Sequence, residues 1–311
     1  MTNDNAILEL QGVRKRFGEL EALKGVDLSI QQGEFFGFLG PNGAGKSTLM
    51  KIFSGFLAAD EGKVLIRGQE VDFHDRKARM TCGLVPQEIA LYDSISPLQN
   101  LKVFGDLYGM GHKQIRERSE DLLQAVGLWD RKNDPVKDFS GGMKRRLNII
   151  ASLLHEPDIL LCDEPTVGVD PQSRNAIFTF LEALNKDGLT IVYTTHYMEE
   201  AERLCRRIAI IDHGAFMACG DLDSLLALSE STRELLIAKG PEMDAFVEEV
   251  RSHGQLMEED LQYRLVPYDD ARLSTIYGII EREGIAYERV QLRTPSLESL
   301  FLQLTGHRLR D

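Results

Sequence analysis

Short apolar runs, separated by polar turns, recur along the chain up to about residue 225. Those of strand length occupy residues 7–10, 22–28, 35–39, 64–67, 82–85, 159–162, 191–195, 208–211 and 215–218. Several of these runs are apolar at every position, which is typical of strands buried in the centre of a parallel sheet. Apolar positions at helical spacing lie between them, and the whole pattern predicts an α/β fold.

Two further segments have their own patterns. From Pro97 to Trp129 apolar residues follow helical spacing, which predicts a helical insertion within a helical subdomain of about residues 88–150. From about Thr232 onward, strand-like segments (234–238, 263–266, 287–292) alternate with helix-like ones (243–251, 271–283, 296–304). This predicts a small α+β domain, in which Ser296 begins the last helix and Gly306 ends it.

Length and charge add limits to this picture. A chain of 311 residues suggests two domains, which we place at residues 1–228 and 229–311. The 36 basic and 49 acidic side chains give a net charge of −13, which argues against nucleic acid as a partner. The cysteines form no Cys-x-x-Cys pair and predict reduced thiols in a cytoplasmic protein. No apolar run approaches the length of a membrane span, so we expect any span to be in another chain.

Residues 40–48 form a glycine-rich turn between a strand-like run and a helix-like run. Such a turn brings backbone N–H groups close to a triphosphate, while Lys46 reaches the β- and γ-phosphates and the Ser47 hydroxyl binds Mg²⁺. We therefore expect a triphosphate and Mg²⁺ as ligands. The expected phosphate-binding residues are Gly40, Pro41, Asn42, Gly43, Ala44, Gly45, Lys46, Ser47 and Thr48.

Two carboxylates follow a later apolar strand. In parallel sheets ligands bind at the carboxyl ends of strands, which is where Asp163 and Glu164 emerge. Asp163 is placed to hold Mg²⁺ through water, and Glu164 to orient or deprotonate the attacking water. The alternative is a pair of solvated acids with no role in chemistry.

Other candidates are weaker when taken alone. Phe17 is able to stack on an adenine ring, although a lone phenylalanine more often packs in a core. Ser140 with Gly141 and Gly142 predicts a helix N-terminus that attracts an anion, although Ser-Gly-Gly is also a common turn. His196 ends an apolar strand and is able to bridge a phosphate and a water, although a terminal histidine is often only structural.

Taken in order, these motifs resemble the ATP-binding cassette of ABC transporters, over about residues 6–225. The matching segments are residues 40–48, Gln87, residues 139–143, Asp163 with Glu164, Val169 with Asp170, and His196. The resemblance implies a P-loop NTPase fold with a helical subdomain. It also implies a head-to-tail dimer, with a second copy or a homologous cassette, that encloses two ATP molecules. In that dimer the phosphate loop of one subunit faces Ser140, Gly141 and Gly142 of the other.

The resemblance also assigns roles. Lys46, Gln87, Glu164 and His196 become the catalytic group, with Glu164 as the catalytic carboxylate and His196 as a switch. Gln87 is expected to sense the γ-phosphate and to join Ser47 and Asp163 as a metal ligand. The Asp170 loop is expected to cross the dimer interface, and Phe17 to stack on adenine.

The signature segment departs from the commonest family pattern, because Phe139 and Met143 stand where most members have Leu and Gln. Met143 and the end of the chain, residues 294–306, are similar to the branch that exports drugs and antibiotics. We therefore expect an ATPase subunit on the inner face of the cell membrane, bound to a separate permease.

The alternative is a soluble ABC-type ATPase that acts on ribosomes or DNA, whereas a nucleotide kinase does not explain the signature, Glu164 and His196 together. The role of the C-terminal domain stays open between a stabilising extension and dimerisation or docking.

Overall fold

The computed structural model describes residues 5–71, 80–230, 232–240 and 243–306. They form two compact units, of which the first ends at Leu222 and the second begins at Asp223. The expectation that residues 1–228 and 229–311 form separate domains stays a prediction.

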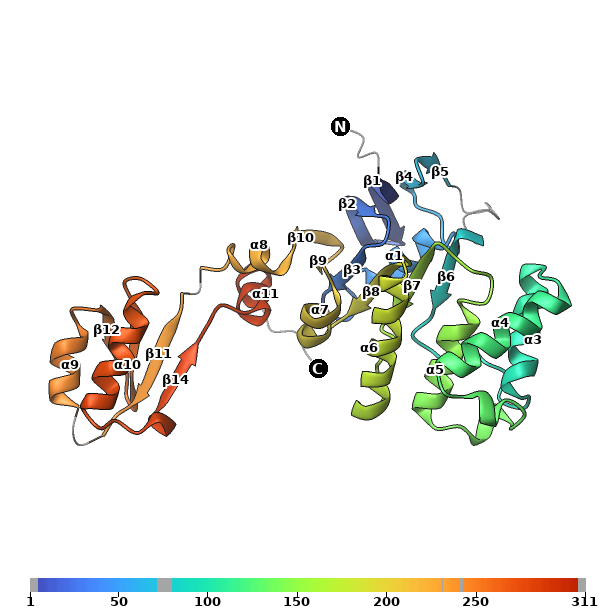
Figure 1. Cartoon of the computed structure of the whole chain (residues 1–311). Coiled ribbons are helices and arrows are strands. Elements are labelled where there is room, and N and C mark those ends of the chain that lie inside the picture. The colour runs from blue at the N-terminus through green and yellow to red at the C-terminus, as the bar shows by residue number, and fades with distance from the viewer. Residues whose placement is uncertain (1–4, 72–79, 231, 241–242, 307–311) are drawn as a thin grey trace. The chain divides into compact units, whose positions relative to one another are not determined.

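The first unit is built on a six-stranded sheet with the strand order β10-β9-β3-β8-β7-β6 (Figure 1). Its strands are β3 (Phe35–Leu39), β6 (Cys82–Val85), β7 (Ile159–Asp163), β8 (Thr190–Thr195), β9 (Arg207–Asp212) and β10 (Ala215–Gly220). All neighbours pair in parallel except β9 and β10, which form an antiparallel hairpin. Every residue of β3, β7 and β8 is buried, as their apolar runs predict. The carboxyl ends of β3, β7 and β8 therefore meet at one edge.

A second, antiparallel sheet has the order β2-β1-β4-β5. It consists of β1 (Ala6–Phe17), β2 (Leu20–Gln31), β4 (Glu61–Ile66) and β5 (Gln69–Glu70). The first two strands are longer than the apolar runs at 7–10 and 22–28. The pairing of β1 with β2 shifts register between Leu10 and Val13, where Gly12 has a φ of 58°. A glycine in that conformation allows a bulge, so the strand continues past the apparent break.

Helices cover the sheets and close two cores. They are α1 (Lys46–Phe53), α3 (Pro97–Tyr108), α4 (His112–Ala125), α5 (Gly141–Ala151), α6 (Pro171–Lys186) and α7 (Met198–Leu204), with 3-10 turns η1 (Trp129–Arg131) and η2 (Val136–Asp138). One core joins α1 to both sheets through residues such as Phe36 and Phe53. The other packs α3 to α6 on the opposite face, through residues such as Phe35 and Leu147. Successive residues of a strand face opposite sides, so β3 serves both cores.

The hairpin expected at His213 and Gly214 is confirmed. Asp212 pairs with Ala215, and the two turn residues have positive φ values of 46° and 77°. This conformation matches the twist of the two strands, and glycine adopts it without strain.

The second unit contains an antiparallel sheet of order β12-β13-β11-β14. Its strands are β11 (Glu234–Ala238), β12 (Gly254–Glu258), β13 (Gln262–Pro267) and β14 (Val290–Arg293), and its helices are α9 (Asp244–Val250), α10 (Arg272–Arg282), η3 (Tyr287–Arg289) and α11 (Leu297–Thr305). The short helix α8 (Leu222–Leu226) lies at the boundary. Residues of α9 and α10 form one core with the sheet, including Phe246, Ile276 and Leu265.

Two expectations for the second unit need correction. The strand predicted at 287–292 begins only at Val290, because Tyr287–Arg289 forms the 3-10 turn η3. The strand β12 was missed, since its sequence contains no β-branched residue. The predicted start and end of α11 are confirmed. Ser296 and Ser299 form a capping box, and Gly306 ends the helix with a φ of 75°.

Across the described ranges, the helices are either too short or too polar to traverse a bilayer. All four cysteines are unpaired, as expected.

Candidate functional site

The loop of residues 40–48 connects β3 to α1, as its sequence predicts. A Cβ atom at Gly40 would lie 2.2 Å from the carbonyl oxygen of Ile211, so only glycine fits there. Gly45, directly before α1, has a φ of 109°, and a Cβ there would lie 2.8 Å from the carbonyl oxygen of Ala22. Close packing against β9 and β2 therefore requires two glycines of the loop. The Ser47 side chain is at the first turn of the helix, where backbone N–H groups attract an anion.

Lys46 and Glu164 form a buried ion pair next to the loop of residues 40–48. Lys46 Nζ lies 2.9 Å from Glu164 Oε1, and the side chains are only 4% and 5% exposed. The same ammonium donates to the carbonyl oxygens of Gly40, at 2.7 Å, and Pro41, at 3.0 Å. Burying two charges is favourable only where they are well paired, as they are here.

Glu164 is the centre of a larger cluster. Gln87 Nε2 donates to Glu164 Oε2 at 3.4 Å, and His196 Nδ1 lies 3.3 Å from the same oxygen without the geometry of a hydrogen bond. The backbone of Glu164 has a φ of 45°, which is unusual for a residue with a side chain. Such strained conformations concentrate at functional sites. Thus the structure brings Lys46, Gln87 and His196 together around one carboxylate.

Thr194 on β8 orients both acids, and sequence analysis missed it. Its hydroxyl donates to Asp163 Oδ1 at 2.8 Å and accepts a hydrogen bond from the backbone N–H of Glu164 at 2.9 Å. A threonine within a strand is common, so the sequence contains no signal for this role.

A buried carboxylate, Glu200 of α7, was missed as well. It accepts hydrogen bonds from the hydroxyls of Thr166 (2.7 Å), Tyr193 (3.0 Å) and Thr195 (2.7 Å). Burial, and then the charge of Glu200, raise the pKa of Tyr193 well above its usual value. The network holds the segment that follows Glu164 against the strand that leads to His196.

The donor groups fit a Mg²⁺ ion that arrives with a nucleotide. Asp163 is buried at the strand end, and the candidate ligands Ser47, Gln87 and Asp163 all offer oxygen atoms. Mg²⁺ in nucleotide sites usually binds one or two protein ligands, phosphate oxygens and water. Within the described part of the chain, no cluster of three or more acidic, histidine or cysteine side chains is arranged to hold a metal by itself.

Ser140 caps α5, as predicted. Its Oγ accepts a hydrogen bond from the backbone N–H of Met143 at 3.3 Å, and Gly141 has open space around it. Gly142 instead packs against Ser173 in the first turn of α6. Asp170 caps that helix, accepting a bond from the Ser173 N–H at 2.9 Å, and bonds from Ser173 hold the pKa of Asp170 below its usual value. The signature segment and the Asp170 loop therefore meet at Ser173.

Phe17 ends β1 with 49% of its surface exposed, so it is not a core residue. Lys15 Nζ lies 5.6 Å from the centre of its ring. Among the described residues, no hydrogen bond or ion pair joins Phe17 or Ser140 to the cluster around Glu164.

The packing of Gly142 gives a testable consequence. We expect Gly142→Ala to destabilise the protein by about 1–3 kcal/mol, since the new methyl group would overlap the side chain of Ser173. Chemical denaturation measures this change. The matched control is Gly141→Ala, which places the same methyl group in open space and should cost nothing. Equal losses in both variants would contradict the assigned packing.

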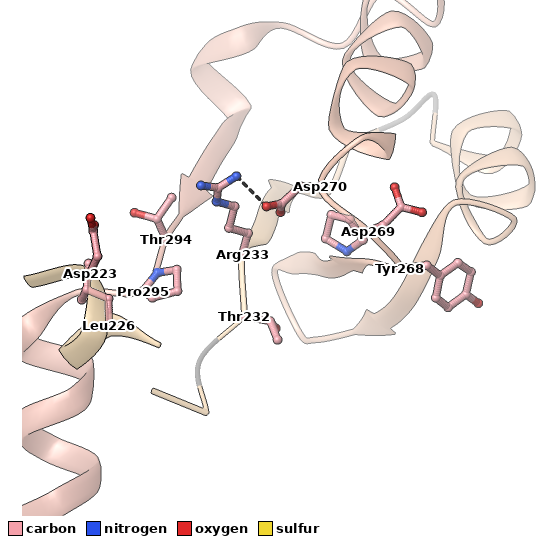
Figure 2. Close-up of a pocket in the computed structure, with 10 residues that line it drawn as sticks. Asp223, Leu226, Thr232, Arg233, Tyr268, Asp269, Asp270, Thr294 and Pro295 are labelled. Carbon is pink, nitrogen blue, oxygen red and sulfur yellow. Dashed lines mark hydrogen bonds and ion pairs between the residues drawn. The ribbon is translucent and has the colours of Figure 1, made fainter. Parts of the chain in front are cut away.

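A separate pocket of about 710 Å³ lies in the second unit. Figure 2 shows Arg233 facing Asp270, with which it forms an ion pair of 2.9 Å, while the ring of Tyr268 points away from them. The cation of this pocket is already paired, and most of the side chains that line the pocket are exposed.

Comparisons with known proteins agree with the geometry. Residues 23–167 match the family model described as ABC transporter. The chain is 38% identical to the linearmycin resistance ATP-binding protein LnrL of Bacillus subtilis (strain 168), over 98% of this chain and 100% of the relative. It is 36% identical to the daunorubicin resistance ATP-binding protein DrrA3 of Streptomyces coeruleorubidus, over 97% of this chain and 96% of the relative. It is also 36% identical to the Nod factor export ATP-binding protein I of Ralstonia nicotianae, over 98% of this chain and 95% of the relative.

Solved structures resemble the cassette. One is cbiO1 of Clostridium perfringens, part of an ABC transporter complex, with a TM-score of 0.66, 29% identity and coverage of 72% of this chain and 92% of that one. Another is the dimeric, post-hydrolysis state of the cassette MJ0796 bound to ADP and Pi, with a TM-score of 0.63, 30% identity and coverage of 69% and 98%. The chain therefore belongs to the ATP-binding, ATP-hydrolysing cassettes of the ABC transporter family.

Proposed function

We propose that this protein is the ATPase subunit of an ABC exporter and drives a separate membrane permease from the cytoplasmic face. The observation that supports this most is the cluster in which Glu164 contacts Lys46, Gln87 and His196. These are the groups that a hydrolysing cassette needs in one place. The relatives named for linearmycin resistance, daunorubicin resistance and Nod factor export support the direction of transport.

ATP binding changes the partners of Lys46. Phosphate oxygens replace Glu164 as the acceptor of its ammonium, and Glu164 then becomes available as the base that orients or deprotonates the attacking water. Gln87 and His196, which already contact Glu164, position that water and the γ-phosphate. Asp163, Ser47 and Gln87 would hold Mg²⁺, which would supply positive charge to the phosphates.

A second cassette completes each site. Ser140, Gly141 and Gly142 open the helix α5, whose N-terminus attracts an anion, and in our proposal they contact the ATP held by the partner's loop. Asp170 lies beside this segment, because Ser173 contacts both Asp170 and Gly142, and in our proposal Asp170 crosses the same interface. Phe17, half-exposed at the end of β1, stacks on adenine. The dimeric state of a related cassette supports this arrangement.

The permease selects the transported compound in this proposal. Relatives named for different compounds are almost equally similar to this chain, at 36% to 38% identity, which supports assigning the choice of compound to the permease. The cassette supplies energy to whichever permease binds it.

The test is a capture experiment from detergent-solubilised membranes. Tagged Glu164→Gln, incubated with ATP, should copurify with a hydrophobic protein that has several apolar spans, because the variant stays in the closed, ATP-bound dimer. The same protein without ATP is the control. Recovery of ribosomes or DNA, or of no partner, would contradict the exporter proposal.

A further inference from the structure

The helix α5 carries a row of polar side chains that form hydrogen bonds with the segment containing Gln87. Ser152, directly after α5, donates to the carbonyl oxygen of Leu84 at 2.7 Å, and Asn148 accepts a bond from the N–H of Ala90 at 3.1 Å. Arg145 donates to the carbonyl oxygens of Pro86, at 2.9 Å, and Gln87, at 2.6 Å. The spacing of three and four residues places all three side chains on one helix face.

Arg145 is the unusual member of this row. The residue is only 4% exposed, and its Nε has no hydrogen-bond partner. Among the described residues no carboxylate forms an ion pair with it, so the two backbone carbonyls are what compensate the buried charge. A buried guanidinium is costly to retain, and its planar fork is suited to holding two acceptors at a fixed spacing.

Gln87 is therefore held from two sides. Its backbone carbonyl is fixed to α5 through Arg145, and its side-chain amide reaches Glu164 at 3.4 Å. Close packing reinforces the first contact, since a Cβ at Gly83 would lie 2.1 Å from the carbonyl oxygen of Ser152. A shift of α5 would therefore act directly on the backbone of Gln87.

We propose that Arg145 is a positioning residue for hydrolysis, which holds Gln87 against Glu164 and makes this glutamine follow the movement of the helix that begins at Ser140. Arg145 lies about 7.5 Å along the helix axis from Ser140, since each residue rises about 1.5 Å. Engagement of Ser140 by a second cassette thus changes the position of Gln87 through one rigid helix. The inference rests on the proposed function, because it takes Glu164 as the catalytic carboxylate.

A double-mutant cycle on the full-length protein tests this proposal. We expect Arg145→Met to lower the kcat of ATP hydrolysis about tenfold, since small displacements of a catalytic group have effects of this size. The KM for ATP should stay within about twofold, because the hydrogen bonds of Arg145 end on Pro86 and Gln87 and not on the phosphate loop. In a Gln87→Ala background, the additional loss of kcat caused by Arg145→Met should be less than about twofold. A merely structural role of Arg145 would give independent effects that multiply, which would overturn the proposal.

The chain offers a matched control. Ser152→Ala removes a bond of the same row that ends on Leu84 and not on Gln87, so its effect on kcat should be the same with or without Gln87→Ala. If Arg145→Met does not fold, the cycle uses Arg145→Lys, which keeps the charge and loses the fork. This variant should have a kcat between those of the wild type and Gln87→Ala, and again no added effect in the Gln87→Ala background.

Different outcomes would contradict the role of Arg145 and the role of Glu164. If Glu164→Gln is inactive but the effects of Arg145 and Gln87 multiply, only the role of Arg145 is wrong. A normal kcat in Gln87→Ala also overturns it, since Arg145 then has no glutamine to act through. Full activity in Glu164→Gln would instead contradict the assignment of the site itself.

Discussion

Glu164→Gln should lower the kcat of ATP hydrolysis by about 100-fold or more, which is the usual contribution of a positioned general base. The amide keeps the shape of the carboxylate and its contact with Gln87, but it does not accept a proton from the attacking water. ATP binding should persist, because the loop and Lys46 are unchanged. The measurements are steady-state ATPase, nucleotide binding, and the mass of the ATP-bound species in solution, where the dimer should accumulate.

Glu34→Gln is the matched control. Glu34 is also a buried carboxylate in an ion pair, 3.1 Å from Arg207, but it lies at the opposite end of β3 from the phosphate loop. Its replacement should lower thermal stability and leave kcat close to that of the wild type. If both variants lost activity equally, general destabilisation would explain the result. If Glu164→Gln hydrolysed ATP normally, its role as the base would be wrong.

Much of the first unit is predictable because its signals are local. The apolar runs that become β3, β7 and β8 are buried on both faces, and the glycines of residues 40–48 have conformations or neighbours that exclude side chains. Their order along the chain therefore predicts both the sheet and the edge at which Asp163 and Glu164 emerge. Ser140 and Ser296 were predictable as helix caps for the same reason, since a cap acts on the next three residues.

The residues that were missed act over long separations. Thr194 contacts acids about thirty positions earlier, and Arg145 contacts carbonyls 58 and 59 positions earlier. Glu200 receives bonds from two different segments. In the sequence, Thr194 is an ordinary strand residue, and Arg145 and Glu200 are ordinary polar helix residues. Only the tertiary fold therefore reveals their roles.

Lys46→Ala should have the second large effect. Loss of one charged hydrogen-bond donor to the phosphates should weaken ATP binding by about 10- to 100-fold, which corresponds to about 1.5–3 kcal/mol. Hydrolysis should fall as well, since the developing charge on the γ-phosphate is no longer stabilised. Nucleotide titration and steady-state ATPase measure the two effects separately. Normal hydrolysis in this variant would contradict the assignment of the phosphate loop.

The ion pair adds a second consequence that separates stability from binding. Without Lys46 the buried carboxylate of Glu164 loses its lysine partner and keeps only His196 beside it, so Lys46→Ala should destabilise the nucleotide-free protein by about 3–5 kcal/mol. Lys46→Ala combined with Glu164→Gln removes both charges and should recover most of that stability, but it should recover none of the ATP affinity. Recovery of both would mean that Lys46 serves only to neutralise Glu164. Recovery of stability alone would mean that Glu164 pairs with Lys46 in the nucleotide-free protein, and that the phosphates of ATP replace Glu164 as the partner of Lys46.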